Sequence, residues 1–202
     1  MYFRSSAAKL PSSRVARHQA RPDRCRAAAQ ASGRVRAGRH RFCEWVKKGE
    51  PLCLIGDSGT GKSHLLIALG TEAAMQGFRV RYVLATKLVN ELVEAADNKQ
   101  LSKTIARYGR VDLLCIDELG YMELDRRGAE LLFQVLTEQE EKNSVAIASN
   151  ESFSGWTKTF TDPRLCAAIV DHLTSNGAII QTGTESYRLA HTKAQAQAQK
   201  AG

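Results

Sequence analysis

Two features are missing from this chain of 202 residues, and each absence narrows the class of protein. No apolar run approaches the roughly 18 to 20 residues that a membrane-spanning helix needs, so we expect no contact with a membrane. No two cysteines stand at a CxxC spacing, and the five cysteines are odd in number. Cys53 and Cys115 lie in apolar runs, where a free thiol packs as a small hydrophobic group. These observations favour a reduced, cytoplasmic protein.

Acidic residues are almost absent from residues 1–42, which hold ten Arg and one Lys against Asp23 alone. This segment has a balance of +10, so the rest of the chain carries −2 of the total of +8. The segment has no apolar periodicity, and we predict a disordered basic arm. It also lacks the amphipathic stripe of a transit peptide. Any contact with nucleic acid is therefore expected from this arm or from a local patch on a nearly neutral domain.

The remaining sequence alternates between short apolar runs and segments with helical spacing, and Thr86 is the expected N-cap of one helix. Strands that alternate with helices and are apolar throughout predict a parallel sheet covered on both faces. We expect an α/β domain at residues 43–190, with a five-stranded, mostly parallel sheet, and a disordered tail at 191–202. The predicted strands are 52–55, 79–84, 111–116, 144–149 and 178–181, and the predicted helices are 62–75, 86–96, 100–108, 125–140 and 163–173.

A glycine-rich octapeptide, Gly56 to Ser63, matches the phosphate-loop pattern G-x-x-x-x-G-K-[ST] at every position. Its glycines let the backbone aim successive N–H groups at phosphate oxygens, and the helix that follows adds its positive end. Lys62 is expected to reach the β- and γ-phosphates, and the Ser63 hydroxyl to ligate magnesium. An apolar strand precedes the loop and an amphipathic helix follows it, as this motif requires. The predicted nucleotide-binding residues are Gly56, Asp57, Ser58, Gly59, Thr60, Gly61, Lys62, Ser63 and His64.

Two carboxylates, Asp117 and Glu118, end a second apolar run. In a parallel sheet the carboxyl end of a strand opens onto the ligand crevice. We predict that Asp117 helps to hold Mg²⁺, and that Glu118 orients and deprotonates the water that attacks the γ-phosphate. The alternative is that Asp117 and Glu118 are ordinary solvated acids at a strand end. We favour the catalytic interpretation because a complete phosphate loop precedes them in the sequence.

Asn150 follows a third apolar run and takes the place of a carboxylate at that strand end. We predict that its amide contacts the attacking water or a γ-phosphate oxygen. The alternative is an Asn that only begins a turn, which this residue favours generally. The predicted catalytic residues are thus Lys62, Glu118 and Asn150.

Other residues have both a functional and a structural interpretation. A group of six basic residues forms either a face for DNA phosphates or an ordinary solvated surface. Trp156 is expected to pack in the core rather than to stack on a nucleic-acid base, and His64 stands where it could cap a helix. The six basic residues are Arg79, Arg81, Lys87, Lys103, Arg107 and Arg110.

The motifs, in this order, resemble those of the AAA+ ATPases and especially the IstB/DnaC-like group. The resemblance covers residues 49–190 and is closest to the IstB-like proteins, which are ATPase helpers of two-protein transposition systems. It is carried by GDSGTGKSHLL at 56–66, IDELGY at 116–121, GAELLFQVL at 128–136, Ser149-Asn150, Trp156, and SYRL at 186–189.

This resemblance implies a protein that uses ATP and Mg²⁺, forms an ATP-dependent oligomer, binds double-stranded DNA and stimulates a partner transposase. A DnaC-like loader of a replicative helicase shares every nucleotide motif, so it stays an alternative. Tight association with a hexameric helicase, with no effect on strand transfer, would identify such a loader. A P-loop GTPase or a small-molecule kinase fits less well, because residues 96–101 lack the Asp of the guanine-reading N-K-x-D motif.

This chain departs from the family pattern in three places. Residues 1–42 do not resemble the helical region that IstB-like proteins carry before the ATPase core. Gln139 and His172 stand where family members tend to have arginine. An arginine from a neighbouring subunit can raise the rate of phosphoryl transfer about 10³- to 10⁵-fold, and an imidazole cannot make its bidentate contact. Arg164 and Arg188 are the remaining candidates, and we expect ATP binding to tolerate these changes better than hydrolysis.

Overall fold

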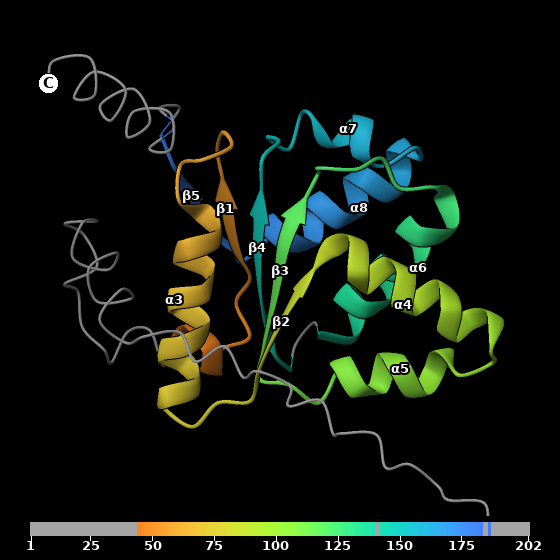
Figure 1. Ribbon diagram of the computed structural model, residues 1–202, viewed down its shortest axis with the longest axis horizontal. Coiled ribbons are helices and arrows are strands. Elements are labelled where there is room, and N and C mark those ends of the chain that lie inside the picture. Colours follow the sequence, from red (N-terminus) through yellow and green to blue (C-terminus); the bar gives the residue numbers. More distant parts are fainter. Residues whose placement is uncertain (1–43, 140–141, 184–185, 187–202) are drawn as a thin grey trace, which may run out of the picture.

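A single parallel sheet organises the computed structural model, which describes residues 44–139, 142–183 and 186 (Figure 1). The strand order is β2-β3-β4-β1-β5, and every neighbouring pair is parallel. The predicted α/β architecture and its five strands are confirmed. The strands are β1 (Leu52–Ile55), β2 (Val80–Leu84), β3 (Leu113–Leu119), β4 (Ser144–Ser149) and β5 (Ala178–Gln181). The helices are α3 (Lys62–Met75), α4 (Ala85–Asp97), α5 (Leu101–Tyr108), α6 (Arg126–Gln139), α7 (Trp156–Thr159) and α8 (Pro163–Thr174).

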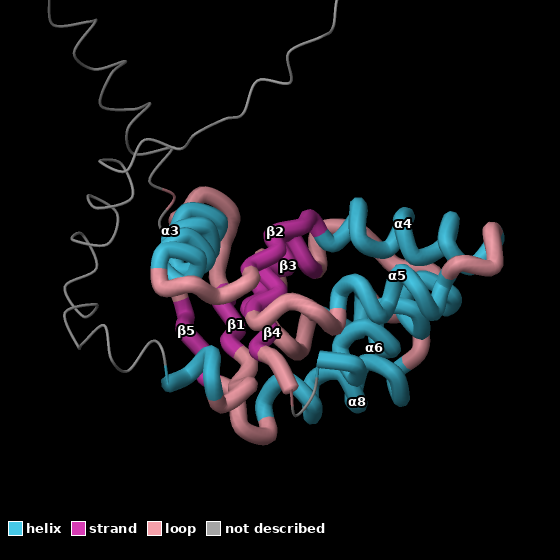
Figure 2. The backbone as a smooth tube through the Cα atoms, turned by 90° about the horizontal axis from the view of Figure 1, so that it is seen from below, coloured by secondary structure: helices cyan, strands magenta, loops and turns pink. Residues whose placement is uncertain are grey.

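The sheet separates two apolar clusters, because successive residues of a strand point to opposite faces. On one face Leu54 and Cys115 pack with residues of α3. On the other face Ile116 and Ile147 pack with residues of α4, α6 and α8. Figure 2 shows α3 on one side of the strands and these other helices on the opposite side. Burial on both faces accounts for the apolar sequence of β1 and for the apolar runs LLCI in β3 and VAIA in β4.

Two of the free thiols lie in this core, as predicted. Cys53 and Cys115 are each 1% exposed and make no disulfide. Burial raises the pKa of both thiols to about 12, so they stay protonated near neutral pH. They act as packing residues, and the reactive thiolate form is suppressed.

Several predicted boundaries need correction. The expectation that Thr86 caps a helix is wrong, because β2 runs directly into α4, with Leu84 at the N-cap position and no side-chain cap. β3 extends beyond residue 116 to Leu119, since its pairing with β4 resumes there. α7 was not predicted, because a helix of 4 residues is too short to show a 3.6-residue period.

The predicted basic arm at 1–42 and the predicted tail at 191–202 lie outside the described residues, as does Arg188. In the described part of the chain, no helix is both long and apolar enough to cross a membrane.

Candidate nucleotide-binding site

Three predicted motifs meet at one edge of the sheet. β1 leads into the glycine-rich loop, β3 carries the acidic pair, and β4 ends one residue before Asn150. β4 lies between β3 and β1, and the backbone N–H of Gly56 donates to the carbonyl oxygen of Ser149 across 3.3 Å. The motifs are distant in the chain but adjacent in space, at the strand ends where α/β proteins bind their ligands.

The loop of residues 56–61 has the backbone that phosphate binding requires. Gly59 and Gly61 have φ angles of 85° and 92°, which residues with a β-carbon rarely adopt. α3 begins at Lys62, and no side chain caps its first turn. The N–H groups of this turn therefore point toward an anion site at the positive end of the helix.

The segment that follows β5 packs against the glycine-rich loop of residues 56–61. The hydroxyls of Thr60 and Thr182 share a hydrogen bond of 2.7 Å. A β-carbon at Gly56 would collide with Thr182, and one at Gly59 would collide with the Ser186 hydroxyl. Close packing against the Thr182 backbone thus favours glycine at position 56, whereas a side chain at position 59 would have to displace the Ser186 hydroxyl. Sequence reasoning missed the contact, because Thr60 and Thr182 are separated by 122 positions.

The Lys62 side chain lies inside the loop. It is 5% exposed, and its Nζ donates to the carbonyl oxygens of Gly56 at 2.6 Å and Asp57 at 2.7 Å. Burial lowers the pKa of Lys62, and the nearby negative charges of Asp117 and Asp57 partly offset this by raising it. A buried ammonium next to exposed backbone N–H groups complements the charge of a phosphate.

The other predicted loop residues have different surroundings. The Thr60 hydroxyl donates to the Asp57 carbonyl oxygen at 2.8 Å and tightens the loop. Asp57, Ser58 and His64 are exposed. His64 lies inside the first turn of α3 rather than at its N-cap, which is Gly61. The roles of these exposed side chains in nucleotide binding stay predictions.

Asp117 and Ser63 form the pair expected of a magnesium site. The Ser63 hydroxyl donates to Asp117 Oδ1 at 3.2 Å, and Asp117 is 3% exposed. Mg²⁺ in nucleotide sites takes one or two protein oxygens together with phosphate oxygens and water. The described residues contain no group of three or more His, Cys, Asp and Glu that could hold a metal ion. The Ser63 hydroxyl and the Asp117 carboxylate match in number and kind the protein oxygens that such an ion takes.

A third residue at this pair was missed by sequence reasoning. Tyr82 of β2 donates its hydroxyl hydrogen to Asp117 Oδ2 at 2.6 Å. The sequence predicts that both segments are strands, but it does not show that β2 and β3 are neighbours. Without that strand order, nothing in the residue pattern connects Tyr82 with the acidic pair.

Asp117 and Glu118 lie in a β-bulge that directs their carboxylates into different surroundings. The register of β3 against β4 shifts between Ile116 and Leu119, so Asp117 and Glu118 together face the single residue Ala148. Glu118 has a φ of 60°, a left-handed conformation that costs a residue with a β-carbon roughly 1–2 kcal/mol. Asp117 is buried, whereas Glu118 is exposed. Bulges re-aim side chains next to active sites, and this one presents Glu118 to solvent beside the magnesium pair.

The turn that carries Asn150 is fixed by Ser149 and Trp156. The Trp156 indole N–H donates to Ser149 Oγ at 2.9 Å, and the backbone N–H of Glu151 donates to the same oxygen at 3.1 Å. Ser149 Oγ in turn donates to the Glu151 carbonyl oxygen at 2.8 Å. Trp156 is 0% exposed, which confirms the prediction that it packs in the core. Asn150 is thereby held at the edge between the loop and β3, and its sensor role stays a prediction.

Replacing Trp156 with Phe is expected to destabilise the domain by about 1–3 kcal/mol, since the Ser149 hydroxyl loses its buried indole donor while the apolar packing is largely kept. Urea denaturation followed by circular dichroism measures this change. Thr157→Ala, an exposed substitution on the same short helix, serves as the control. Equal denaturation midpoints for Trp156→Phe and the wild type would contradict this account of the turn.

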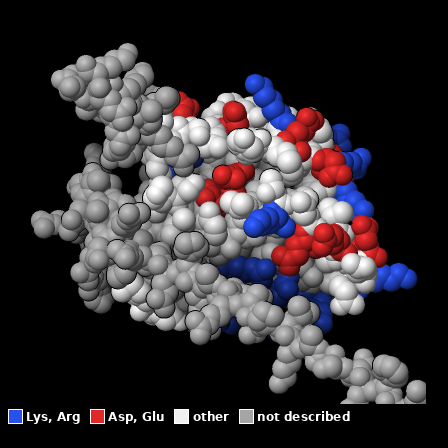
Figure 3. Space-filling view, viewed as in Figure 1, with Lys and Arg blue, Asp and Glu red and all other residues white. Residues whose placement is uncertain are grey.

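Half of the residues of the predicted basic face, three arginines, form ion pairs with two acids. Arg79 pairs with Asp112 at 2.7 Å, and both Arg81 and Arg107 pair with Glu91. Figure 3 shows acidic and basic residues intermingled over the right of the visible face, and a group of basic residues together at its lower centre. The ion pairs favour a solvated surface over a continuous face for phosphates. The members that enter no ion pair within the described residues are Lys87, Lys103 and Arg110.

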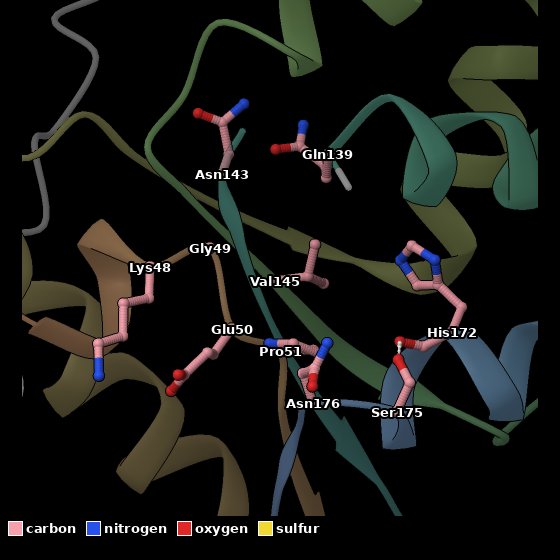
Figure 4. Close-up of a pocket in the computed structure, with 10 residues that line it drawn as sticks. All are labelled: Lys48, Gly49, Glu50, Pro51, Gln139, Asn143, Val145, His172, Ser175 and Asn176. Atoms are coloured by element: carbon pink, nitrogen blue, oxygen red, sulfur yellow. Dashed lines mark hydrogen bonds between the residues drawn. The ribbon is translucent and has the colours of Figure 1, made fainter. Parts of the chain in front are cut away.

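Two of the three departures from the family pattern, Gln139 and His172, lie together at the other end of the sheet. Gln139 and His172 line one pocket of about 490 Å³, alongside Pro51 before β1 and Asn143 before β4 (Figure 4). The Gln139 amide donates to the carbonyl oxygen of Tyr108 at 2.7 Å, while its Oε1 has no hydrogen-bond partner in the described part of the chain. Within one chain this pocket and the glycine-rich loop are at opposite ends of β1.

Fold and site together define a P-loop ATP-binding domain of the AAA+ type. Among solved structures, the DnaC helicase loader is similar with a TM-score of 0.60 and 19% identity, over 71% of this chain and 86% of that chain. The AMPPCP-bound DnaA from Aquifex aeolicus is similar with a TM-score of 0.60 and 24% identity, over 78% of this chain and 50% of that chain. These likenesses establish the fold.

The family is established by sequence. The model of the family described as "IstB-like ATP binding protein" matches residues 23–196, and this chain belongs to that family. The "Putative insertion sequence ATP-binding protein y4iQ/y4nD/y4sD" of Sinorhizobium fredii is 36% identical over 71% of this chain and 48% of that protein. The "Insertion sequence IS5376 putative ATP-binding protein" of Geobacillus stearothermophilus is 34% identical over 77% of this chain and 62% of that protein. The chain thus spans about half to three fifths of the length of these relatives.

Proposed function

We propose that this chain is an ATP-hydrolysing helper of DNA transposition. It binds ATP with Mg²⁺, assembles into an ATP-dependent oligomer, binds double-stranded target DNA and stimulates a partner transposase. The observation that carries the ATP chemistry is the hydrogen bond between Ser63 and Asp117, which joins the glycine-rich loop to the acidic strand end. The role in transposition is supported by family membership and by relatives named as insertion sequence ATP-binding proteins.

Nucleotide binding is assigned to the loop. The N–H groups of residues 56–63 surround the phosphates, and Lys62 supplies a buried positive charge beside them. Ser63 and Asp117 hold the magnesium ion, which when bound neutralises charge on the phosphate oxygens. These contacts position the γ-phosphate at the sheet edge that Glu118 and Asn150 share.

Hydrolysis is assigned to Glu118. Its exposed carboxylate accepts a proton from water as that water attacks the γ-phosphate, a general-base step. Asn150 at the neighbouring strand end orients this water or a γ-phosphate oxygen. An arginine from a neighbouring copy completes charge stabilisation, and Arg164, exposed at the start of α8, is our candidate among the described residues.

The proposal as a whole is tested by an in vitro strand-transfer assay with the transposase of the same insertion sequence. ATP hydrolysis and strand transfer are measured with and without duplex DNA. We expect this chain to increase strand transfer, and we expect the increase to require both ATP and Mg²⁺. Tight association with a hexameric helicase, with no effect on strand transfer, would support the helicase-loader alternative instead.

DNA affinity is expected to reside mainly in residues 1–42. This segment carries +10 whereas the rest carries −2, and half of the candidate basic face is ion-paired. If about six of its cations contact phosphates, duplex affinity falls about 10³-fold between roughly 50 and 200 mM salt. Deleting residues 1–42 should weaken binding at low salt and flatten this dependence, as measured by fluorescence anisotropy.

A deletion of residues 191–202 is the control, since it removes a terminal segment with only two lysines. Unchanged DNA affinity and salt dependence after deletion of residues 1–42 would place the contact on the ATPase domain.

A further inference from the structure

Tyr82 makes the shortest of the hydrogen bonds to the Asp117 side chain. Its hydroxyl lies 2.6 Å from Oδ2, compared with 2.9 Å from the Glu118 backbone N–H to Oδ1 and 3.2 Å from the Ser63 hydroxyl to Oδ1. Ser63 and the Glu118 backbone thus share one carboxylate oxygen, and Tyr82 alone among the described residues donates to the other. Its removal would leave Oδ2 without a hydrogen-bond donor among the described residues.

Strand pairing explains how Tyr82 reaches this carboxylate. Tyr82 is paired with Cys115, and Leu84 is paired with Asp117, so Tyr82 and Asp117 stand one pleat apart on the same face of neighbouring strands. This is also the face that α3 and Ser63 cover. Side chains on one face of adjacent strands at this diagonal spacing are within reach of a long aromatic residue. Tyr82 and Ser63 therefore hold the Asp117 carboxylate from two different elements.

The hydroxyl of Tyr82 is a permanent donor. A tyrosine phenol has an ordinary pKa of about 10 and is therefore protonated at neutral pH. A protonated phenol beside a carboxylate has one favourable arrangement, with the O–H directed at the carboxylate oxygen.

We propose that Tyr82 is a positioning residue for the magnesium site: it fixes the rotation of the Asp117 carboxylate so that the acceptor sites that remain face the nucleotide. This inference rests on the proposed function, in which Asp117 and Ser63 hold Mg²⁺. It assigns Tyr82 no contact with the nucleotide. The effect of Tyr82 is consequently specific to the metal, and the affinity for nucleotide without metal does not depend on it.

The test is the substitution Tyr82→Phe in the full chain, which keeps the ring and removes only the hydroxyl. Binding of a fluorescent, non-hydrolysable ATP analogue is titrated with Mg²⁺, and then repeated in EDTA. We expect the apparent dissociation constant for Mg²⁺ to rise about tenfold, the effect of one hydrogen bond to a charged group. The affinity for the analogue in EDTA should stay at the wild-type value.

Tyr121→Phe is the matched control, because Tyr121 follows β3 with 74% of its surface exposed and makes no hydrogen bond through its side chain within the described residues. A second measurement combines Tyr82→Phe with Asp117→Asn. If Tyr82 acts through Asp117, the Tyr82 substitution has no further effect on Mg²⁺ affinity in the Asp117→Asn background. Thermal unfolding of each variant establishes that the fold is kept.

The outcomes separate this inference from the proposed function. A wild-type titration that depends on Mg²⁺, together with the same Mg²⁺ affinity in Tyr82→Phe, would overturn the role of Tyr82 and leave the proposed function intact. An equal loss of affinity with and without Mg²⁺ would also overturn it, since that pattern indicates a general structural effect. A wild-type protein whose nucleotide affinity does not respond to Mg²⁺ would overturn both.

Discussion

Replacing Lys62 with alanine is expected to abolish ATP binding, with an increase in the dissociation constant of about 100-fold or more. Removing one partner of a buried, hydrogen-bonded charge pair costs about 2–5 kcal/mol, and each 1.4 kcal/mol is about tenfold in affinity. Lys62 is such a partner because the residue is 5% exposed and its ammonium donates to carbonyl oxygens of the loop. The substitution also removes the two hydrogen bonds that tie Nζ to the loop carbonyls.

Equilibrium binding of a fluorescent ATP analogue measures this effect. Lys48→Ala is the matched control, since it removes the same charge near the opposite end of β1, in the pocket of Figure 4. Circular dichroism distinguishes loss of binding from loss of the fold. Wild-type affinity in the Lys62→Ala variant would refute the assignment of residues 56–63 as the phosphate loop.

Replacing Glu118 with glutamine is expected to lower ATP turnover about 10²- to 10⁴-fold, the usual contribution of a general base. The amide keeps the size and hydrogen-bonding capacity of the side chain but cannot accept the proton of the attacking water. ATP binding should be unchanged, because the loop contacts and the Ser63–Asp117 hydrogen bond do not involve the Glu118 side chain. Glutamine also keeps the β-carbon, so the left-handed backbone is equally strained in both proteins.

Turnover is measured as phosphate release under saturating ATP and Mg²⁺, and binding with the same fluorescent analogue. Glu123→Gln is the control because Glu123 is an exposed carboxylate that follows the same strand. If Glu118→Gln hydrolyses ATP at the wild-type rate, the base is another group and the bulge has a purely structural role.

The elements of the site that are local in sequence were predictable. The phosphate loop is a run of eight residues whose chemistry depends on their identity and spacing, and its strand and helix context is confirmed. The acidic pair and Asn150 were located because apolar runs end there, and parallel strands bring such ends to one edge. The structure places all three motifs as expected.

The features that depend on which strands are neighbours were not predictable. The bulge arises where β3 changes register against β4, and the residue pattern of β3 alone is that of a regular strand. Tyr82 meets Asp117 only because β2 borders β3. The hydrogen bond between Thr60 and Thr182 forms only because β5 borders β1. A sequence of alternating strands and helices predicts the class of fold but leaves this order open.

Because hydrogen bonds already hold the glycine-rich loop in place, we expect nucleotide binding to cost it little conformational entropy. A loop that must become ordered on binding loses conformational freedom, at about 0.5–1.5 kcal/mol for each side chain immobilised. Here Thr60, Lys62 and Thr182 hold the loop through hydrogen bonds of their own, and Gly56 is packed against Thr182. The N–H groups that we propose bind the phosphates are therefore already held in place by the protein. We expect little of the binding free energy to be spent on ordering the loop, and we expect association to require no slow rearrangement of it.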